Sequence, residues 1–219
     1  IAGRTNDNRP VLTSEYAHAM GNALGNLDEY WKEIYSEKRM LGGFIWEWAD
    51  GGIATEMPDG KTRISYGGDF GDVPNLKAFC IKGIVTGDRN TGPKYAEVKK
   101  VYQPVGIEMR NNNLLIINKN HHTTLSQYRC QWKLLVNGKE TGRGEINLPD
   151  VQPGDSILID SPVSKLILPE GDIHLNVLFV LKENNSWAKA GFEVAYEQFE
   201  LRKAKLPATS ITNKGQLIV

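Results

Sequence analysis

The chain of 219 residues has little cysteine, no excess of charge of either sign and no long apolar run. Its two cysteines, Cys80 and Cys130, lie far apart, so neither a disulfide framework nor a cysteine zinc site is indicated. The 26 basic and 26 acidic side chains cancel, and no basic block offers a footprint for nucleic-acid phosphates. No apolar stretch approaches the roughly 20 residues of a membrane span. These absences argue against nucleic acid and membrane as partners, while the compartment stays open between cytoplasm and periplasm.

What the chain does have is enough apolar material, 40% of its residues, for one large core or two modest ones. It begins with Ile1 rather than methionine, carries no signal-peptide pattern and enters a structured run almost at once. We therefore expect a piece of a longer parent. Residues 204–219 are predicted to be a linker and the first strand of a further domain.

The first half of the chain alternates strand and helix patterns. An apolar run over residues 10–17 predicts a strand, and residues 22–38 place apolar side chains at helical spacing. A second strand is predicted at 44–48 and a helix at 93–104. The stretch of roughly 40 residues between them is rich in Gly, Asp and Pro, which predicts a functional loop or disorder. This order of elements is the repeat of a parallel sheet or barrel.

The second half consists of short β-rich runs separated by turn signals such as Asn-Gly. Residues 105–203 are predicted to form a sandwich of about seven strands, the size of an immunoglobulin-like domain. Trp132 is interpreted as core packing. The adjacent His121 and His122 could attract a metal, but neighbours on an extended chain point to opposite sides, which favours a solvated loop.

Glu15 lies at the end of the first predicted strand, just before a turn of small residues. Catalytic residues of strand-and-helix barrels occupy this position. A carboxylate there can equally cap the next helix or pair with an arginine. Its position alone supports the catalytic and the structural interpretation of Glu15 equally.

Five motifs follow one another along nearly the whole chain: SEYAHAMGN, GGFIWEWAD, YGGDFGD, AFCIKG and WAKAGFEVAYEQFEL. Together they resemble the large multidomain β-galactosidases of glycoside hydrolase family 2. The resemblance implies an α/β plus all-β fold class. Residues 1–104 would be the last part of a (β/α)8 TIM barrel, and residues 105–203 an immunoglobulin-like β-sandwich.

The resemblance also implies a retaining β-galactosidase with Glu15 as the nucleophile. His18 would contact galactose hydroxyls, and Trp46 would form an apolar floor under the sugar. The acid/base glutamate of the family comes from an earlier barrel strand, and neither Glu47 nor Asp50 is expected to replace it. Glu47 is interpreted as structural, since strand alternation would point it away from Trp46. The chain alone is therefore expected to be inactive.

The resemblance implies two metals near the loop. Asn75 would lie close to a magnesium site whose ligands are upstream, and the Phe79 carbonyl would bind sodium. Better-known members have an asparagine where this chain has Lys82. Because its ammonium could occupy the place of the cation, sodium binding is doubtful.

Other functions stay open beside β-galactosidase. Relatives with β-glucuronidase or β-mannosidase activity share the Ser-Glu-aromatic core, although the AHAMGN extension favours galactosidase. A carbohydrate-binding or structural module without catalysis is the alternative from another class. The expected partners are a β-galactoside, the remainder of the parent chain and, as in the family, further copies in a homo-oligomer.

Overall fold

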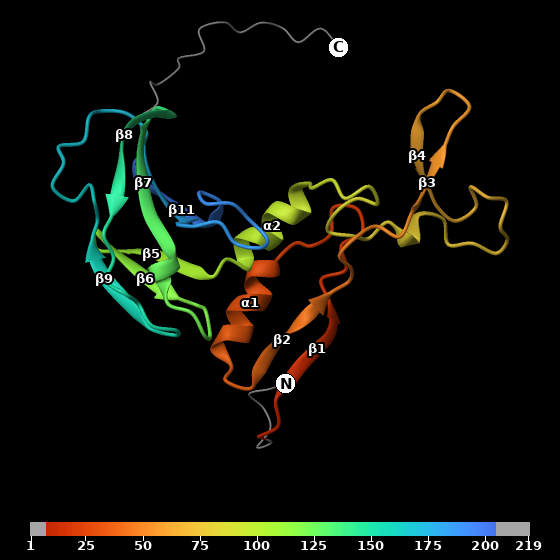
Figure 1. The fold of residues 1–219 in the computed structure, drawn as a ribbon, viewed down its shortest axis with the longest axis horizontal. Coiled ribbons are helices and arrows are strands. Elements are labelled where there is room, and N and C mark those ends of the chain that lie inside the picture. Colours follow the sequence, from red (N-terminus) through yellow and green to blue (C-terminus); the bar gives the residue numbers. More distant parts are fainter. Residues whose placement is uncertain (1–7, 205–219) are drawn as a thin grey trace, which may run out of the picture. The chain divides into compact units, whose positions relative to one another are not determined.

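The computed structural model describes residues 8–204 and separates the chain into two compact units, Ile1–Tyr102 and Gln103–Val219 (Figure 1). We name them the barrel unit and the sandwich unit. The linker and further strand predicted at 204–219 fall, beyond Ala204, outside the described residues. No helix within residues 8–204 combines the length and the apolar character needed to cross a membrane.

The barrel unit opens with a βαβ repeat. Strand β1 (Val11–Tyr16) pairs in parallel with β2 (Met40–Ile45), and helix α1 (Leu27–Ser36) connects them (Figure 1). Parallel neighbours require such a crossover, because a tight turn can join only antiparallel strands. The alternation of strand and helix predicted from periodicity is therefore present.

Helix α1 is shorter than the predicted 22–38. Asn26 precedes it in the left-handed conformation, with φ 61°, so the helix cannot extend back through the small residues before it. Leu27, Trp31 and Ile34 then follow at helical spacing, with Leu27 and Ile34 buried. The apolar stripe matches the prediction, and the start of the helix was placed wrongly.

Strand β2 lies earlier than the predicted 44–48, because its Gly-Gly pair belongs to the strand. A Cβ on Gly43 would lie 2.9 Å from the Thr13 carbonyl oxygen and 2.9 Å from a ring carbon of Tyr16. Glycine is required where two strands approach this closely. The pair that resembles a strand breaker is thus a contact site between β1 and β2.

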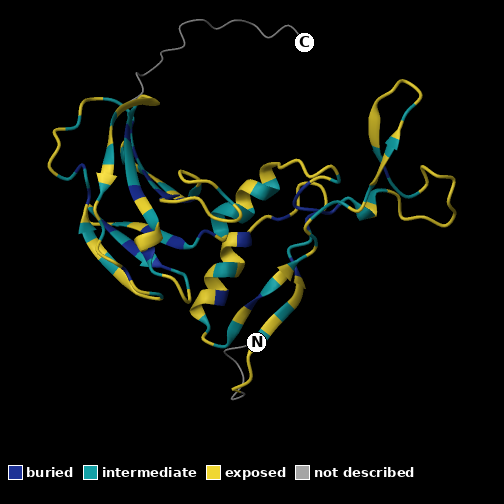
Figure 2. Cartoon of the chain, in the orientation of Figure 1, coloured by how far each residue is buried: buried dark blue, intermediate teal, exposed yellow. Residues whose placement is uncertain are grey.

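The long loop contains an antiparallel hairpin that was not predicted from the sequence. Strands β3 (Ile53–Glu56) and β4 (Thr62–Ser65) pair with each other and are largely exposed (Figure 2). At their turn the Met57 backbone N–H donates to the Lys61 carbonyl at 2.8 Å, and Gly60 has φ 77°. The Pro-Asp-Gly turn signal between two short runs was available to predict this hairpin.

The rest of the barrel unit is the 3₁₀ helix η2 (Lys77–Cys80) and helix α2 (Pro93–Val101). Helix α2 begins at a proline, as predicted, because an N-terminal helix position needs no N–H donor. Its Tyr95 and Val98 pack on a small core. The buried residues of that core are Tyr16, Ala19, Leu24, Leu27 and Ile84.

Within residues 103–204 the sandwich unit has seven strands in two antiparallel sheets, in agreement with the predicted number. One sheet has the order β11-β10-β7-β8 and the other β5-β6-β9. The strands are β5 (Val105–Arg110), β6 (Asn113–Asn118), β7 (Tyr128–Val136), β8 (Lys139–Ile146), β9 (Ser156–Asp160), β10 (Ile173–Leu181) and β11 (Glu193–Arg202). A 3₁₀ turn, η3 (Leu125–Gln127), leads into β7.

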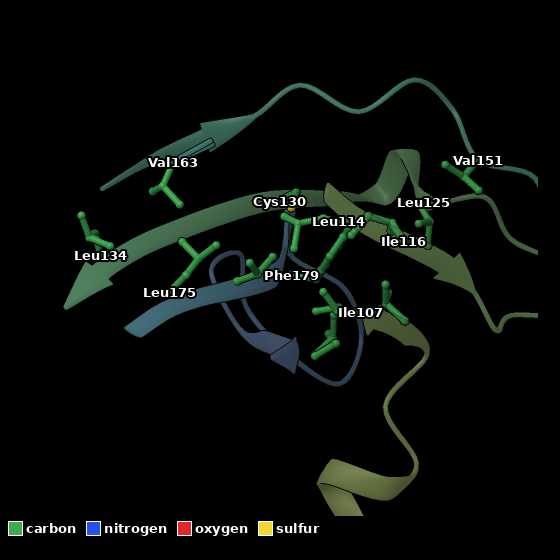
Figure 3. Packing of buried hydrophobic residues seen from close by; sticks show 14 of the residues in the cluster. Ile107, Leu114, Ile116, Leu125, Cys130, Leu134, Val151, Val163, Leu175 and Phe179 are labelled. Atoms are coloured by element: carbon green, nitrogen blue, oxygen red, sulfur yellow. The ribbon is translucent and has the colours of Figure 1, made fainter. Parts of the chain in front are cut away.

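Both sheets contribute to one core. Figure 3 shows Leu114 of β6 beside Cys130 of β7 and Phe179 of β10, all pointing into the same interior. Alternation along β10 produces this arrangement, since Ile173, Leu175, Val177 and Phe179 are all fully buried.

Trp132 has the packing role that was predicted for it. Its side chain packs against the buried core of the sandwich unit. A Cβ on Gly144 of the neighbouring strand would be 2.8 Å from its indole nitrogen. The glycine on β8 therefore makes room for the ring.

Candidate active site

Glu15 is the second-last residue of β1 and is exposed. Its neighbour Tyr16 is buried, so alternation directs the two side chains to opposite sides of the strand. The chain then turns sharply at Ala17, which has φ 49°. This combination places a carboxylate at the carboxyl end of a parallel strand with its side chain open to a ligand.

Tyr16, on the opposite side of β1 from Glu15, anchors the end of this strand through its buried hydroxyl. Its hydroxyl lies 2.6 Å from the Tyr102 hydroxyl and accepts a hydrogen bond from the Trp31 indole N–H at 2.9 Å. Burial and the bond with Tyr102 raise the pKa of Tyr16 far above its usual range, so it stays a neutral anchor. No role was predicted for Tyr16 from the sequence; alternation next to Glu15 is the signal that could have marked it as the inward-facing residue.

Backbone hydrogen bonds continue beyond the ends of β1 and β2. The Trp46 N–H donates to the Tyr16 carbonyl at 3.3 Å, and the Ala19 N–H donates to the Trp46 carbonyl at 3.2 Å. The loop that carries His18 is therefore tied to the segment that carries Trp46. His18 is half-buried, and 43% of Trp46 is exposed.

A buried lysine connects the aromatic residues of the site. The Lys82 ammonium lies 5.7 Å from the centre of the Trp46 ring and 5.7 Å from that of Phe79. The Phe79 ring lies 5.8 Å from the His18 ring, centre to centre. Lys82 is only 9% exposed, so its charge requires compensation from aromatic faces and a carboxylate. The structure thus brings together His18 and Trp46 through two residues of the long loop.

The carboxylate is Glu47, whose Oε1 lies 3.2 Å from the Lys82 ammonium. The Glu47 N–H also donates to the Lys82 carbonyl at 3.2 Å, and its own carbonyl accepts from Ile84 at 2.9 Å. The predicted alternation between Glu47 and Trp46 was wrong, because both lie beyond the end of β2 and both contact Lys82. Glu47 is nevertheless engaged in holding the loop.

Asp50 also forms hydrogen bonds with backbone groups of the loop. Its Oδ1 accepts a hydrogen bond from the Gly83 N–H at 2.7 Å, and its own N–H donates to Val85 at 3.0 Å. A Cβ on Gly83 would lie 2.1 Å from the Asp50 nitrogen, so glycine is required there. The segment containing Glu47 and Asp50 therefore holds Lys82 and Gly83 in place through backbone hydrogen bonds and the Glu47 carboxylate.

The predicted metal residues differ in their surroundings. Asn75 uses its amide within its own loop: it donates to the Asp72 carbonyl at 2.8 Å and accepts from the Lys77 N–H at 3.1 Å. Phe79 contacts His18 and Lys82 through its ring. Within the described part of the barrel unit, no three His, Cys, Asp or Glu side chains converge closely enough to hold a metal ion.

Comparison with known proteins identifies related sequences for both units. A family profile described as "Glycosyl hydrolases family 2, TIM barrel domain" matches residues 2–107, and one described as "Beta-galactosidase, domain 4" matches residues 114–202. The chain is 38% identical over 210 residues to a β-galactosidase of Priestia megaterium, covering 93% of the chain and 20% of the relative.

Two further relatives show the same coverage. A β-galactosidase of Vibrio cholerae is 38% identical over 203 residues, with 92% of the chain and 20% of the relative covered. One of Bifidobacterium adolescentis is 36% identical over 209 residues, with 94% and 20% covered. The chain therefore spans about a fifth of the length of the curated relatives it matches.

Proposed function

Because the chain belongs to glycoside hydrolase family 2, we propose that it is part of a retaining β-galactosidase in which Glu15 is the nucleophile. The observation that carries the proposal is the exposed Glu15 at the carboxyl end of β1, backed by the buried Tyr16. The names of the relatives support a galactoside as the substrate. β-Glucuronides and β-mannosides are the alternative substrates within the family.

A retaining glycosidase needs two carboxyl groups about 5–5.5 Å apart. Glu15 attacks the anomeric carbon to form a glycosyl-enzyme, and the second group first protonates the leaving oxygen and later activates water. Glu47 is paired with Lys82, and Asp50 accepts from Gly83, so neither is suited to be that second group. The acid/base residue is proposed to come from another part of the parent, which leaves this chain without hydrolase activity of its own.

His18 and Trp46 are the proposed sugar-binding residues. A neutral imidazole both donates and accepts, which matches a sugar hydroxyl, and the exposed part of the indole offers an apolar face to the ring C–H groups. Support comes from the hydrogen bonds and ring contacts that link both residues to the end of β1.

Lys82 is proposed to occupy the position of a monovalent cation. Its buried ammonium beside the Phe79 ring supports this, because a bound sodium at the same place would repel it. Activity of the full-length parent is expected to be the same in sodium and potassium chloride. Lys82→Asn is the matched variant and is expected to make the activity depend on sodium. Strong sodium dependence of the unmodified parent contradicts the proposal.

The described residues do not supply a magnesium site by themselves, since the amide of Asn75 is used within its loop. If the parent holds magnesium, its ligands come from other segments, with Asn75 nearby. No step assigned to Glu15 runs through the metal.

The sandwich unit is proposed to be an immunoglobulin-like domain that supports the assembly without chemistry. Its first, second and fifth strands form one sheet, as strands A, B and E do in immunoglobulin domains. In constant-type immunoglobulin domains the fourth strand is at the edge of this same sheet. Here the fourth strand, β8, pairs with β7 at the edge of the other sheet.

Exposed apolar side chains support a larger assembly for the barrel unit. Leu12 on β1 is 51% exposed, and Leu41 and Phe44 on β2 are 65% and 63% exposed. These side chains are proposed to pack against other barrel strands of the parent. The parent is further proposed to be a homo-oligomer, as is common in the family.

Covalent trapping tests the nucleophile directly. A 2-deoxy-2-fluoro-β-galactoside is expected to inactivate the full-length parent and to label the peptide that contains Glu15, as measured by mass spectrometry. Label on another carboxylate refutes the assignment. Saturable galactose binding without any label favours a non-catalytic module, and trapping only by the glucuronide or mannoside analogue selects the alternative substrates.

A separate assay tests the chain by itself. The purified 219-residue chain is expected not to cleave a chromogenic β-galactoside. Turnover by the chain that disappears in Glu15→Gln would show that it already contains a complete catalytic pair.

A further inference from the structure

A group of three potential metal ligands lies on the sandwich unit: Asp172, His174 and Glu200. One ligand atom from each residue lies within 4.8 Å of those of the other two. Asp172 and His174 are half-buried and Glu200 is exposed. Within residues 8–204 this is the one group of three His, Cys, Asp or Glu side chains with such spacing.

Sheet geometry creates the group. His174 and Glu200 are directly paired across β10 and β11. Asp172 precedes β10 and is two residues from His174, so alternation turns both to the same side. The residues between and after them, Ile173 and Leu175, are fully buried, which places His174 on the outer face of the sheet. The three side chains therefore converge because of strand register.

The backbone of Asp172 is held in place before any ligand binds. Its N–H donates to Asn137 Oδ1 at 2.9 Å, and its carbonyl accepts from the Asn137 N–H at 2.8 Å. Asn137 sits in the turn between β7 and β8 with φ 51°, and its amide also approaches Gly171 closely. A ligand held by the fold in this way loses little conformational freedom on binding.

The charges of the group favour a cation. Two carboxylates face one imidazole, and His174 Nδ1 lies 3.5 Å from Asp172 Oδ2. Arg202 is close in sequence to Glu200, but its Nη1 donates to the carbonyls of Leu168 at 3.4 Å and Pro169 at 2.7 Å. Like charges at short range repel, and a divalent ion between them removes that repulsion.

We propose that Asp172, His174 and Glu200 bind a divalent transition-metal ion of the zinc class. One imidazole and two carboxylates suit zinc and its neighbours, and the remaining positions are filled by water. Calcium fits less well, because it takes six to eight oxygen ligands. With bonds of about 2.0–2.2 Å and tetrahedral geometry, two ligand atoms lie roughly 3.3–3.6 Å apart, so the group must close around the ion, and rotation of the exposed Glu200 side chain supplies that closure. This binding is independent of the glycosidase proposal.

Titration of the 219-residue chain with zinc chloride tests the site. The protein is prepared without a histidine tag, stripped with a chelator and measured by isothermal titration calorimetry. One equivalent of zinc is expected to bind and to raise the midpoint of thermal unfolding. Cobalt(II) is expected to bind in its place with an absorption spectrum that lacks thiolate charge-transfer bands, which excludes Cys80 and Cys130 as ligands.

Variants separate this site from adventitious binding. His174→Ala and Asp172→Asn are each expected to lower zinc affinity by at least roughly 10- to 100-fold, since even residues that only orient a ligand have effects of that size. The matched control is the double variant His121→Ala/His122→Ala, which removes two exposed histidines of the same unit. It is expected to bind zinc as the unmodified chain does.

Three outcomes overturn the proposal: no zinc binding, unchanged affinity in His174→Ala, or loss of binding in the control. Circular dichroism of each zinc-free variant shows whether it folds. If His174→Ala does not fold, Glu200→Gln decides in its place, because its side chain is exposed and its replacement keeps the shape. Unchanged affinity in a folded Glu200→Gln variant then refutes the three-ligand site.

Discussion

The sandwich unit and the barrel unit differ in how far their large apolar side chains are buried. Figure 2 colours the residues of both units by burial. In the sandwich, Phe179, Leu114 and Ile116 are fully buried between two sheets. In the barrel unit, Phe44, Trp48 and Leu76 are 63%, 59% and 76% exposed. The sandwich unit thus contains a closed core, whereas the barrel unit keeps apolar surface and the candidate site open.

The first prediction, which has the largest expected effect, tests whether the candidate site lies in the barrel unit and not in the sandwich unit. Glu15→Gln in the full-length parent should reduce kcat by roughly 10⁴-fold or more, because the proposed nucleophile is lost. The matched control is Glu108→Gln, which removes an exposed carboxylate of the sandwich whose partner is Arg110 at 2.8 Å. It should leave kcat unchanged. Equal effects of the two changes would remove the distinction between the units.

The second prediction concerns core packing. Phe179→Ala should destabilise the sandwich by about 3–5 kcal/mol, because it leaves a cavity in a closed core. Phe44→Ala in the barrel unit should change stability within about 0.5 kcal/mol, because Phe44 is already exposed in this chain. Hydrogen exchange of peptides from each unit in urea measures both effects. A larger loss for Phe44 than for Phe179 would reverse the comparison.

The third prediction asks where the barrel unit is tightly packed. Gly83→Ala should destabilise it by about 1–3 kcal/mol, because the new Cβ would overlap the backbone of Asp50. Gly25→Ala is the control, since no heavy atom lies within 4 Å of its Cβ position. Thermal unfolding of the two variants provides the comparison. Equal midpoints would mean that the Asp50–Gly83 contact does not hold the loop.

The fourth effect is the smallest at neutral pH, because it appears only in alkaline solution. Burial raises the pKa of the Cys130 thiol to about 12, from a usual value of about 9. The unfolded thiol therefore ionises first, so stability is complete below pH about 9 and declines toward pH 12, by up to about 1.4 kcal/mol per pH unit. Cys130→Ala should flatten this alkaline decline in urea unfolding, while Cys80→Ala, which changes a half-buried thiol, should not.

Much of the fold followed from local patterns. Alternation and turn signals predicted the seven strands of the sandwich, and apolar spacing predicted α1 and α2. Strand β2 was misplaced because a Gly-Gly pair usually interrupts a strand, whereas here Gly43 is required by the close approach of Thr13. The hairpin β3–β4 was missed because a Gly- and Pro-rich composition concealed a short turn between paired strands.

The candidate site was predictable only in part. Glu15, His18 and Trp46 were identified by motif, and their roles stay predictions. Lys82 was noted for its departure from the family, but its position between the Trp46 and Phe79 rings depends on contacts between distant segments. Likewise the sequence drew attention to His121 and His122, whereas the side chains that converge are those of His174 and two carboxylates.

By itself, then, the sequence determined the order of elements outside the long loop, the change from a strand-and-helix half to a β-rich half, and the family, because periodicity and motifs are local properties of the chain. Tertiary structure decided which charges meet. Lys82 is paired with Glu47 because residues 82–85 run beside residues 46–50, and Glu200 lies opposite His174 because of the register of β10 and β11. Such contacts depend on how distant segments align, and a shift of one residue would turn the side chains to the other face.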